Sequence, residues 1–172
     1  MLVSREFVKN LALIIFIVLF FLIIIDVSVR FFLPQYNEVT EYDDYYLHSL
    51  IPNSNKVQVM AEEDGGEKIL VKINSLGFRG VEFNKIKEKK RIIVYGDSFI
   101  EAEFSALEDT FVRQLEKKLR SYEVINGGVV AYGLDQVSLK LETDLDVFKP
   151  DLVIVSVFPA NDFGDHIRNK IF

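Results

Sequence analysis

Hydrophobic positions follow two patterns along this chain, a continuous run near the N-terminus and short separated runs after residue 90. The first run, LALIIFIVLFFLIII at residues 11–25, has no polar position. With its flanks it makes residues 8–29 long enough to cross a bilayer as a helix. A cleavable signal peptide is the main alternative, but the following DVSVRFFLP has no small-x-small cleavage site. The pattern therefore favours a short tail and an uncleaved membrane anchor over residues 1–33.

Basic residues on the two sides of this run predict its orientation. Arg5 and Lys9 precede it, whereas only Arg30 follows before the acidic and aromatic stretch NEVTEYDDYY. The cytoplasmic flank of a membrane helix usually carries the excess of Lys and Arg. We therefore expect a single-pass membrane protein with a cytoplasmic N-terminus and an extracytoplasmic C-terminal domain.

Residues 34–85 are predicted to form an extracytoplasmic connector that contains one β-hairpin. Residues 35–55 are rich in Tyr, Asp and Asn and predict an irregular segment. Apolar and polar residues alternate on both sides of EEDGGEK, so residues 56–73 are expected to form a hairpin with a tight reversal. The glycines of NSLGFRG predict a loop with left-handed positions. The basic run NKIKEKKR at residues 84–91 predicts a solvated lead into the next strand.

Residues 86–172 show short apolar runs that alternate with amphipathic stretches. The runs predict strands at residues 92–95, 122–126 and 152–158, and the stretches predict helices at residues 110–120 and 134–148. This alternation is typical of βαβ units in a parallel sheet. The third run is apolar apart from Ser156, so we expect its strand to be buried on both faces. The chain is therefore predicted to be an α/β protein.

The composition limits the possible functions. A net charge of -6 argues against binding to nucleic acid. The absence of cysteine excludes disulfides, thiolate metal sites and a cysteine nucleophile. His48 and His166 are the only two histidines in the sequence, which restricts any mechanism that needs an imidazole base.

Three loops follow the carboxyl ends of the predicted strands, where ligands bind in parallel sheets. Residues 96–98 offer the hydroxyl of Ser98, residues 127–133 offer glycine-rich backbone N–H groups, and residues 159–162 offer the amide of Asn161. Acyl transfer needs such a nucleophile together with hydrogen-bond donors for the oxyanion. A serine after Gly-Asp also suits the start of an ordinary helix, so a purely structural role for Ser98 is the alternative.

The blocks VYGDSF, VINGGVVAYG and PAND, in this order and with this spacing, resemble the SGNH (GDSL-type) hydrolase and acyltransferase family. The preceding NSLGFRG is similar to a subgroup of its membrane-anchored or secreted bacterial members. The resemblance covers residues 74–165. It implies a flavodoxin-like domain of three layers around a parallel sheet, and a serine esterase or O-acyltransferase that needs no metal or other cofactor.

The resemblance also implies roles for particular residues. The nucleophilic serine of the family falls on Ser98, and its oxyanion asparagine falls on Asn161. The glycine of its second block falls on Ala131, with Gly133 two residues further on. An alanine N–H can still donate, although a positive φ at that position would be strained. The substrate implied is an acyl ester outside the cytoplasm, such as one on a cell-surface glycan or lipid.

The sequence departs from the family in one important respect, because it has no Asp-x-x-His block. His166 directly follows the third block and is expected to lie in a loop or at the start of a helix. His48 lies in the connector and is expected to be structural or solvent-exposed. We therefore expect an incomplete SGNH domain, the N-terminal part of a longer protein, that is inactive alone.

Two other functions stay open at this point. A non-catalytic SGNH-like binding or assembly protein would use the open edge of the sheet to add a strand from a partner chain. A nucleotide-binding βαβ protein is a weaker alternative, since the glycine-rich loop lacks both Gly-x-Gly-x-x-Gly and a P-loop lysine.

Overall fold

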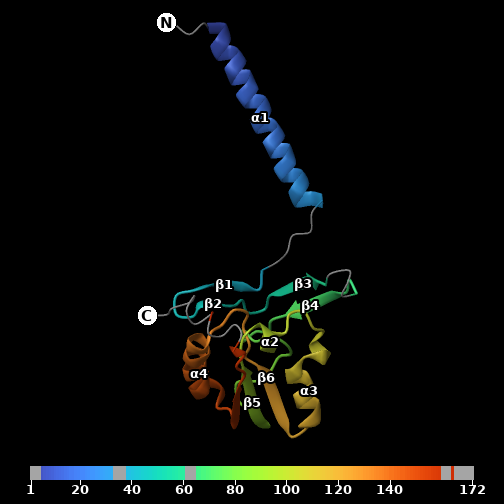
Figure 1. The fold of residues 1–172 in the computed structure, drawn as a ribbon, viewed down its shortest axis with the longest axis vertical. Helices are drawn as coiled ribbons and strands as arrows, with labels where there is room; N and C mark the ends of the chain where they lie inside the picture. Colours follow the sequence, from blue (N-terminus) through green and yellow to red (C-terminus); the bar gives the residue numbers. More distant parts are fainter. Residues whose placement is uncertain (1–4, 33–37, 61–64, 160–163, 165–172) are drawn as a thin grey trace. The chain divides into compact units, whose positions relative to one another are not determined.

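A computed structural model describes residues 5–32, 38–60, 65–159 and 164 of the chain. The chain divides into two compact units, Met1–Tyr36 and Asn37–Phe172 (Figure 1). The boundary predicted between residues 85 and 86 lies inside the second unit, where the hairpins and the parallel sheet share one core.

Helix α1, Arg5–Phe32, contains the predicted apolar run. The most apolar 18-residue stretch within Arg5–Phe31 has a mean hydropathy of 3.2, and the helix is long and apolar enough to cross a membrane. A helix of this length extends about 40 Å, which exceeds the hydrocarbon thickness of a bilayer. Charged side chains pair near its ends, Lys9 with Glu6 at 2.8 Å and Arg30 with Asp26 at 2.9 Å.

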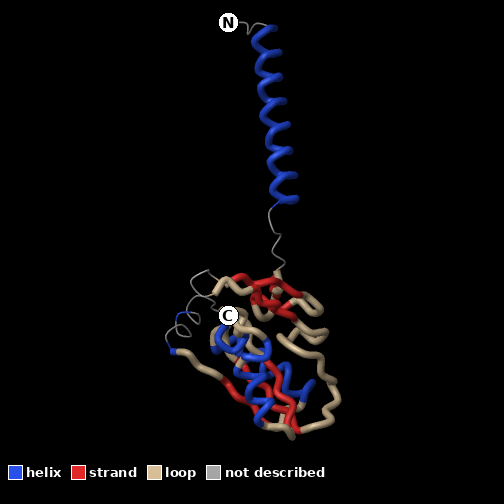
Figure 2. Tube along the Cα trace, turned by 90° about the vertical axis from the view of Figure 1, so that its right-hand side faces the viewer, coloured by secondary structure: helices blue, strands red, loops and turns tan. Residues whose placement is uncertain are grey.

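Two antiparallel hairpins precede the parallel sheet (Figure 2). The first pairs β1, Thr40–Asp43, with β2, Leu47–Leu50, so the prediction of an irregular segment over residues 35–55 is wrong here. Strands of four residues carry too little alternation to be recognised in a sequence rich in Tyr and Asp. The reversal depends on Asp43, whose carboxylate accepts from the N–H groups of Tyr45 and Tyr46, each at 2.8 Å.

The second hairpin confirms the prediction for residues 56–73. Strand β3, Asn55–Val59, pairs with β4, Lys68–Lys72. The alternation has its expected physical basis, because Ile69 and Val71 are buried whereas Leu70 between them is exposed. In the NSLGFRG loop that follows, Gly77 and Gly80 have φ values of 80° and 124°, which confirms the left-handed positions.

A parallel sheet of three strands confirms the predicted α/β pattern. Strand β5, Lys90–Tyr95, lies between β6, Tyr122–Asn126, and β7, Leu152–Val155, and both neighbours run parallel to it. The β5 residues from Arg91 onward are buried, as expected for the central strand of a sheet covered on both faces.

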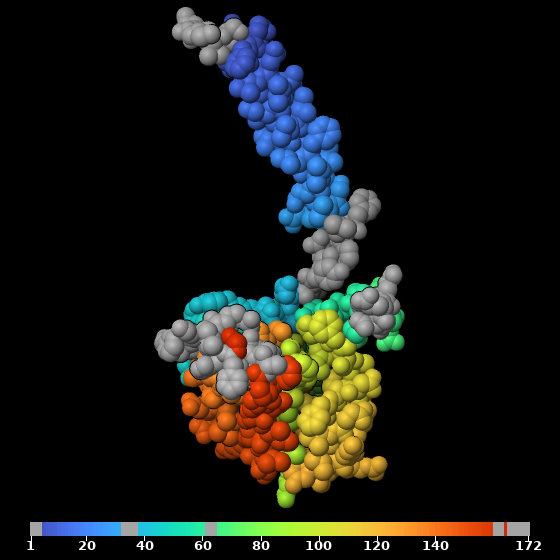
Figure 3. Space-filling view, in the orientation of Figure 1, coloured from blue at the N-terminus to red at the C-terminus, as the bar shows by residue number. Residues whose placement is uncertain are grey.

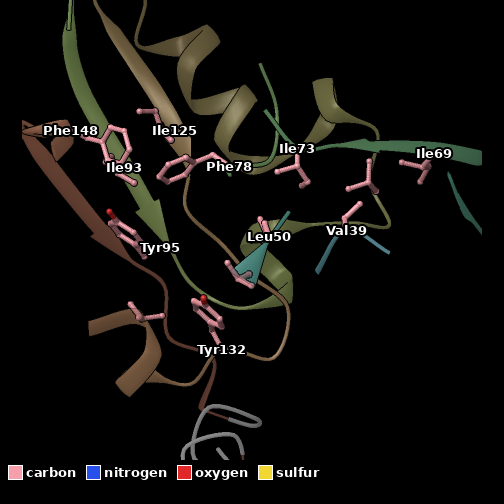
Figure 4. Packing of buried hydrophobic residues seen from close by; sticks show 13 residues of the cluster. Val39, Leu50, Ile69, Ile73, Phe78, Ile93, Tyr95, Ile125, Tyr132 and Phe148 are labelled. Atoms are coloured by element: carbon pink, nitrogen blue, oxygen red, sulfur yellow. The ribbon is translucent and has the colours of Figure 1, made fainter. Parts of the chain in front are cut away.

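Helices α3, Phe111–Lys118, and α4, Leu134–Phe148, cover opposite faces of this sheet (Figure 1). Successive β5 side chains alternate between the faces. Ile93 and Tyr95 pack with residues of α4 and of the hairpins, whereas Ile92 and Val94 pack with Val112 of α3. Figure 4 shows the larger of the two clusters, which joins the sheet to both hairpins.

Strand β7 differs from its prediction in length and burial. It ends at Val155 rather than at residue 158, and the side chains of Leu152 and Val155 are 50% and 42% exposed. Among the described residues β7 pairs with β5 alone, so one of its edges and part of its surface stay uncovered. Figure 3 shows this segment at the surface of the second unit.

The basic run at residues 84–91 also needs a correction, because its last member is buried. Arg91 is completely inaccessible to solvent. Its guanidinium donates to Glu123 Oε1 at 2.9 Å, to the carbonyl of Phe148 at 2.9 Å, and to the carbonyl of Lys85 at 3.1 Å. One side chain thereby joins β5, β6 and the end of α4.

We predict that Arg91→Met destabilises the second unit by about 3–5 kcal/mol, because it leaves Glu123 and buried carbonyl groups without their partner. Urea unfolding of the full chain in detergent micelles, followed by tyrosine circular dichroism, measures the change. Lys118→Met, at an exposed position of α3, is the control and should shift stability by less than about 0.5 kcal/mol. Equal effects of the two substitutions would contradict a structural role for Arg91.

Candidate functional site

Ser98 is the first residue of helix α2, Ser98–Glu101, which begins directly after β5. The helix is capped by the preceding Asp97, whose Oδ1 accepts from the N–H of Phe99 at 3.0 Å. Ser98 is half-buried, and no described group is hydrogen-bonded to its hydroxyl. The capping role therefore belongs to Asp97, and the Ser98 hydroxyl is not used to start the helix.

Gly96 lets the chain turn sharply between β5 and α2. A Cβ atom at this position would lie 2.6 Å from Cγ1 of Ile100 and 3.1 Å from Cβ of Ser156. Such distances are shorter than van der Waals contact, so a larger residue would displace α2. The glycine of the GDS block is therefore needed for packing.

The glycine-rich loop that follows β6 lies directly against α2, as predicted for two loops at one edge of a parallel sheet. A Cβ atom at Gly128 would lie 2.4 Å from the backbone nitrogen of Glu101. Asn126 Nδ2 donates to the carbonyl of Ile100 at 2.7 Å, and the N–H of Val129 donates to the carbonyl of Gly96 at 3.1 Å. Two of the three predicted loops are thus held together by backbone contacts.

Ala131 and Gly133, the two predicted donors in this loop, differ in their surroundings. Ala131 has a φ of 60°, the left-handed conformation that makes alanine strained there. The N–H of Gly133 is buried and donates to Gln136 Oε1 at 3.0 Å at the start of α4. Gly133 would have to give up this bond to bind an oxyanion.

The third predicted loop is described only as far as Pro159. Asn161, Asp162 and His166 lie outside the described residues. The segment that leads to them does reach the site, because the ring of Phe158 lies 4.5 Å from the ring of Phe99.

His48 is close to the site but does not contact the Ser98 hydroxyl. Its Nε2 lies 2.8 Å from the carbonyl oxygen of Val130, and its ring packs edge-on against Tyr132 at 5.1 Å. The residue is half-buried. These contacts place His48 against the second loop.

Glu101 is the residue of this region that sequence reasoning missed. Its side chain is fully buried, and Oε2 accepts from the N–H of Val130 at 2.5 Å. Within the described part of the chain Oε1 has no hydrogen-bond partner. Burial raises the pKa of the Glu101 carboxyl, and the nearby Glu103 raises it further, whereas the Val130 N–H, Lys56 and Arg79 act in the opposite direction.

Arg79, from the NSLGFRG block, holds the other side of α2. Its guanidinium donates to the carbonyls of Glu101 and of Ser105, the latter at 2.7 Å. Burial lowers the pKa of Arg79, while Glu101 and Glu103 raise it. The NSLGFRG block thus contacts the C-terminal end of α2 through Arg79. Its sequence predicted a loop but not this contact.

Ser98 does not line the cavities of about 220 and 240 Å³ that occur in the described part of the chain. Among the residues that the structure describes, no group of three potential metal ligands occurs. The arrangement offers a hydroxyl beside a rigid loop of backbone amides.

The chain was compared with known proteins, and neither a protein-family model nor a curated protein matches it.

We predict a pH-dependent effect of Glu101→Gln. A carboxyl whose pKa is raised on folding contributes its full stability below the pKa of an unfolded glutamate, about 4.3, and loses it as the pH rises through the folded-state pKa. Glutamine does not titrate. The free energy of unfolding of Glu101→Gln, relative to wild type, should therefore rise in urea titrations as the pH is raised above about 4.3.

Glu82→Gln is a control of opposite sign. Hydrogen bonds from the hydroxyl and N–H of Ser75 lower the pKa of Glu82, so its contribution is present at high pH and lost as the pH falls. This variant should become less stable than wild type as the pH rises. A stability difference for Glu101→Gln that stays constant over the same range would refute the prediction.

Proposed function

We propose that this chain is a membrane-anchored SGNH-type serine esterase or O-acyltransferase that acts on extracytoplasmic esters. The observation that carries the proposal is the position of Ser98. It follows the carboxyl end of the central parallel strand, its neighbour Asp97 caps the helix, and a glycine-rich loop packs against that same helix. A hydroxyl held in this way at the edge of a parallel sheet is suited to attack a bound acyl group.

Stabilisation of the oxyanion is assigned to backbone and amide donors. The Ser98 N–H, the Ala131 N–H and the side chain of Asn161 are the proposed donors, with the N–H of Gly133 as the alternative to that of Ala131. Donors of this kind each contribute about 3 kcal/mol to acyl transfer in comparable enzymes. The loop is suited to this role because close backbone contacts hold it rigidly before substrate binds.

A base for Ser98 is the missing component. In the described part of the chain no imidazole contacts its hydroxyl, and His48 is engaged with Val130. The sequence lacks the Asp-x-x-His block that the family uses. Loss of the histidine from a hydroxyl triad lowers turnover by about a million-fold. We therefore propose that these residues alone turn over esters very slowly, and that a partner chain completes the sheet and supplies the base.

The proposed location follows from α1 and the basic residues around it. Residues 8–29 would cross the bilayer, with Arg5 on the cytoplasmic side and Lys9 at the cytoplasmic edge of the span. A membrane anchor would keep the rest of the chain at the membrane, which favours an ester on a lipid or on a cell-surface glycan as the proposed substrate.

We predict that a fluorophosphonate labels Ser98 slowly, and that Ser98→Ala abolishes this labelling and any turnover of p-nitrophenyl acetate. The phosphonate mimics the acyl transition state, so it reports a nucleophile beside an oxyanion site even when turnover is slow. Intact mass of the full chain in detergent micelles gives the extent of labelling. Ser121→Ala, at an exposed position before β6, is the matched control. Labelling that persists in Ser98→Ala would overturn the proposal.

A second candidate function rests on the uncovered edge of β7. Leu152, Val155 and Val157 are each more than a third exposed, and β7 has a neighbour on one side only within the described residues. Such edges bind added strands. The alternative proposal is a non-catalytic, membrane-anchored SGNH-like binding or assembly protein that adds a strand from a partner to β7.

Thiol reactivity tests this alternative, because the natural chain has no cysteine. If a partner covers β7, Val155→Cys should react at least about tenfold more slowly in the membranes of producing cells than in the purified chain. Leu70→Cys, on the exposed face of β4, is the control and should react equally in both. Equal rates at position 155 would exclude a bound partner strand.

The same cysteine variants also test the proposed orientation in the membrane. A membrane-impermeant thiol reagent reports on which side of the membrane the second unit lies.

A further inference from the structure

We infer that His48 and Glu101 are positioning residues that hold the two backbone polar groups of Val130 and thereby fix the direction of the Ala131 amide. The catalytic meaning of this inference rests on the proposed function. The contacts themselves do not, and they join three distant parts of the chain. His48 lies in β2, Glu101 ends α2, and Val130 lies in the loop after β6.

The carbonyl of Val130 is held from the side of the hairpin. His48 Nε2 lies 2.8 Å from this oxygen, which requires a hydrogen on Nε2 because a carbonyl can only accept. A second hydrogen bond joins His48 to the loop after β6: the hydroxyl of Tyr132 donates to the backbone carbonyl of His48 at 2.8 Å. The edge-on packing of the two rings sets the orientation of the imidazole. Figure 4 shows Tyr132 in the cluster that also contains Leu50 of β2.

The N–H of Val130 is held from the side of α2. Oε2 of the buried Glu101 accepts from it at 2.5 Å. Lys56 of β3 and Arg79 are the positive groups around this carboxyl, and Glu103 is the negative one. Lys56 also pairs with Glu103 at 2.5 Å, so the elements around Glu101 are themselves tied together. The carboxyl therefore has little freedom to move away from Val130.

Holding Val130 determines the orientation of the next amide. The carbonyl of Val130 and the N–H of Ala131 belong to one planar peptide group and point in opposite directions. With the carbonyl directed at His48, the Ala131 N–H points away from β2. Ala131 is also in the left-handed region, at a φ of 60°, which is unfavourable for alanine. Such a conformation persists only where surrounding contacts enforce it, and His48 and Glu101 supply contacts of this kind at the preceding residue, Val130.

Two substitutions of His48 separate the hydrogen bond from the packing. His48→Phe keeps a ring against Tyr132 but removes the donor, whereas His48→Gln places an amide N–H near the position of Nε2. In hydrogen exchange of the full chain in detergent micelles, we expect the amides of residues 129–132 to exchange about tenfold faster in His48→Phe than in wild type. His48→Gln should restore most of the protection. Equal exchange in wild type and His48→Phe would overturn the inference, as would a failure of glutamine to rescue.

Glu101 is tested in the same way. Glu101→Gln keeps an acceptor for the Val130 N–H, and Glu101→Leu removes it. We expect loss of protection at Val130 only in the leucine variant. If that variant does not fold, the proton chemical shift of the Val130 amide decides the matter. Recorded at alkaline pH, where Glu101 is ionised, it should move upfield in Glu101→Gln, because an amide oxygen is a weaker acceptor than a carboxylate. An unchanged shift would refute the contact.

Fluorophosphonate labelling of the same variants separates this inference from the proposed function. If both are correct, labelling of Ser98 falls in His48→Phe and recovers in His48→Gln, in parallel with the exchange rates. If wild type is not labelled but exchange follows the expected pattern, the proposed function fails and the positioning of Val130 stands. If labelling is unaffected by loss of loop protection, His48 and Glu101 do not position a catalytic donor.

Discussion

Close contact between the glycine-rich loop and the backbone of α2 is the constraint on which the site depends. The space between them is too small for a side chain, since a Cβ atom at Gly128 would lie 2.4 Å from the nitrogen of Glu101. This approach brings the N–H of Val130 within reach of the Glu101 carboxylate and the Asn126 amide within reach of α2. Backbone atoms can be placed this accurately only when packing leaves no alternative position.

Buried charged groups extend this constraint to the rest of the second unit. Arg91 joins the start of β5 to β6 and α4, and Arg79 joins the loop before β5 to α2. Asp144 of α4 accepts from the Tyr95 hydroxyl at 3.0 Å and pairs with Lys140 at 3.2 Å, while burial raises the pKa of its carboxyl. Because an unpartnered buried charge is costly, each of these contacts specifies one arrangement of the layers.

The two hairpins belong to the same structural unit as the sheet. Residues of β2 and β4 share the core with β5 and α4, and the β1–β2 turn contacts α4 where Gln136 donates to the carbonyl of Tyr46 at 2.7 Å. The segment between α1 and the sheet thus supports the loop near Ser98. Movement of this hairpin would change the surroundings of Val130 directly.

The sequence by itself determined the elements that have a strong local signal. The apolar helix, the β3–β4 hairpin, the three parallel strands and helices α3 and α4 follow from hydrophobic periodicity and turn residues, and Gly-Asp-Ser identified the turn at which Ser98 lies. Tertiary structure decided the rest. The short β1–β2 hairpin, the burial of Arg91 and the exposure of β7 depend on neighbours distant in sequence. So does the assignment of the cap to Asp97, since either Asp97 or Ser98 could cap a helix. Glu101 and His48 carry no local signal, because their partner Val130 is brought to them only by the folded sheet and the hairpin packed against it.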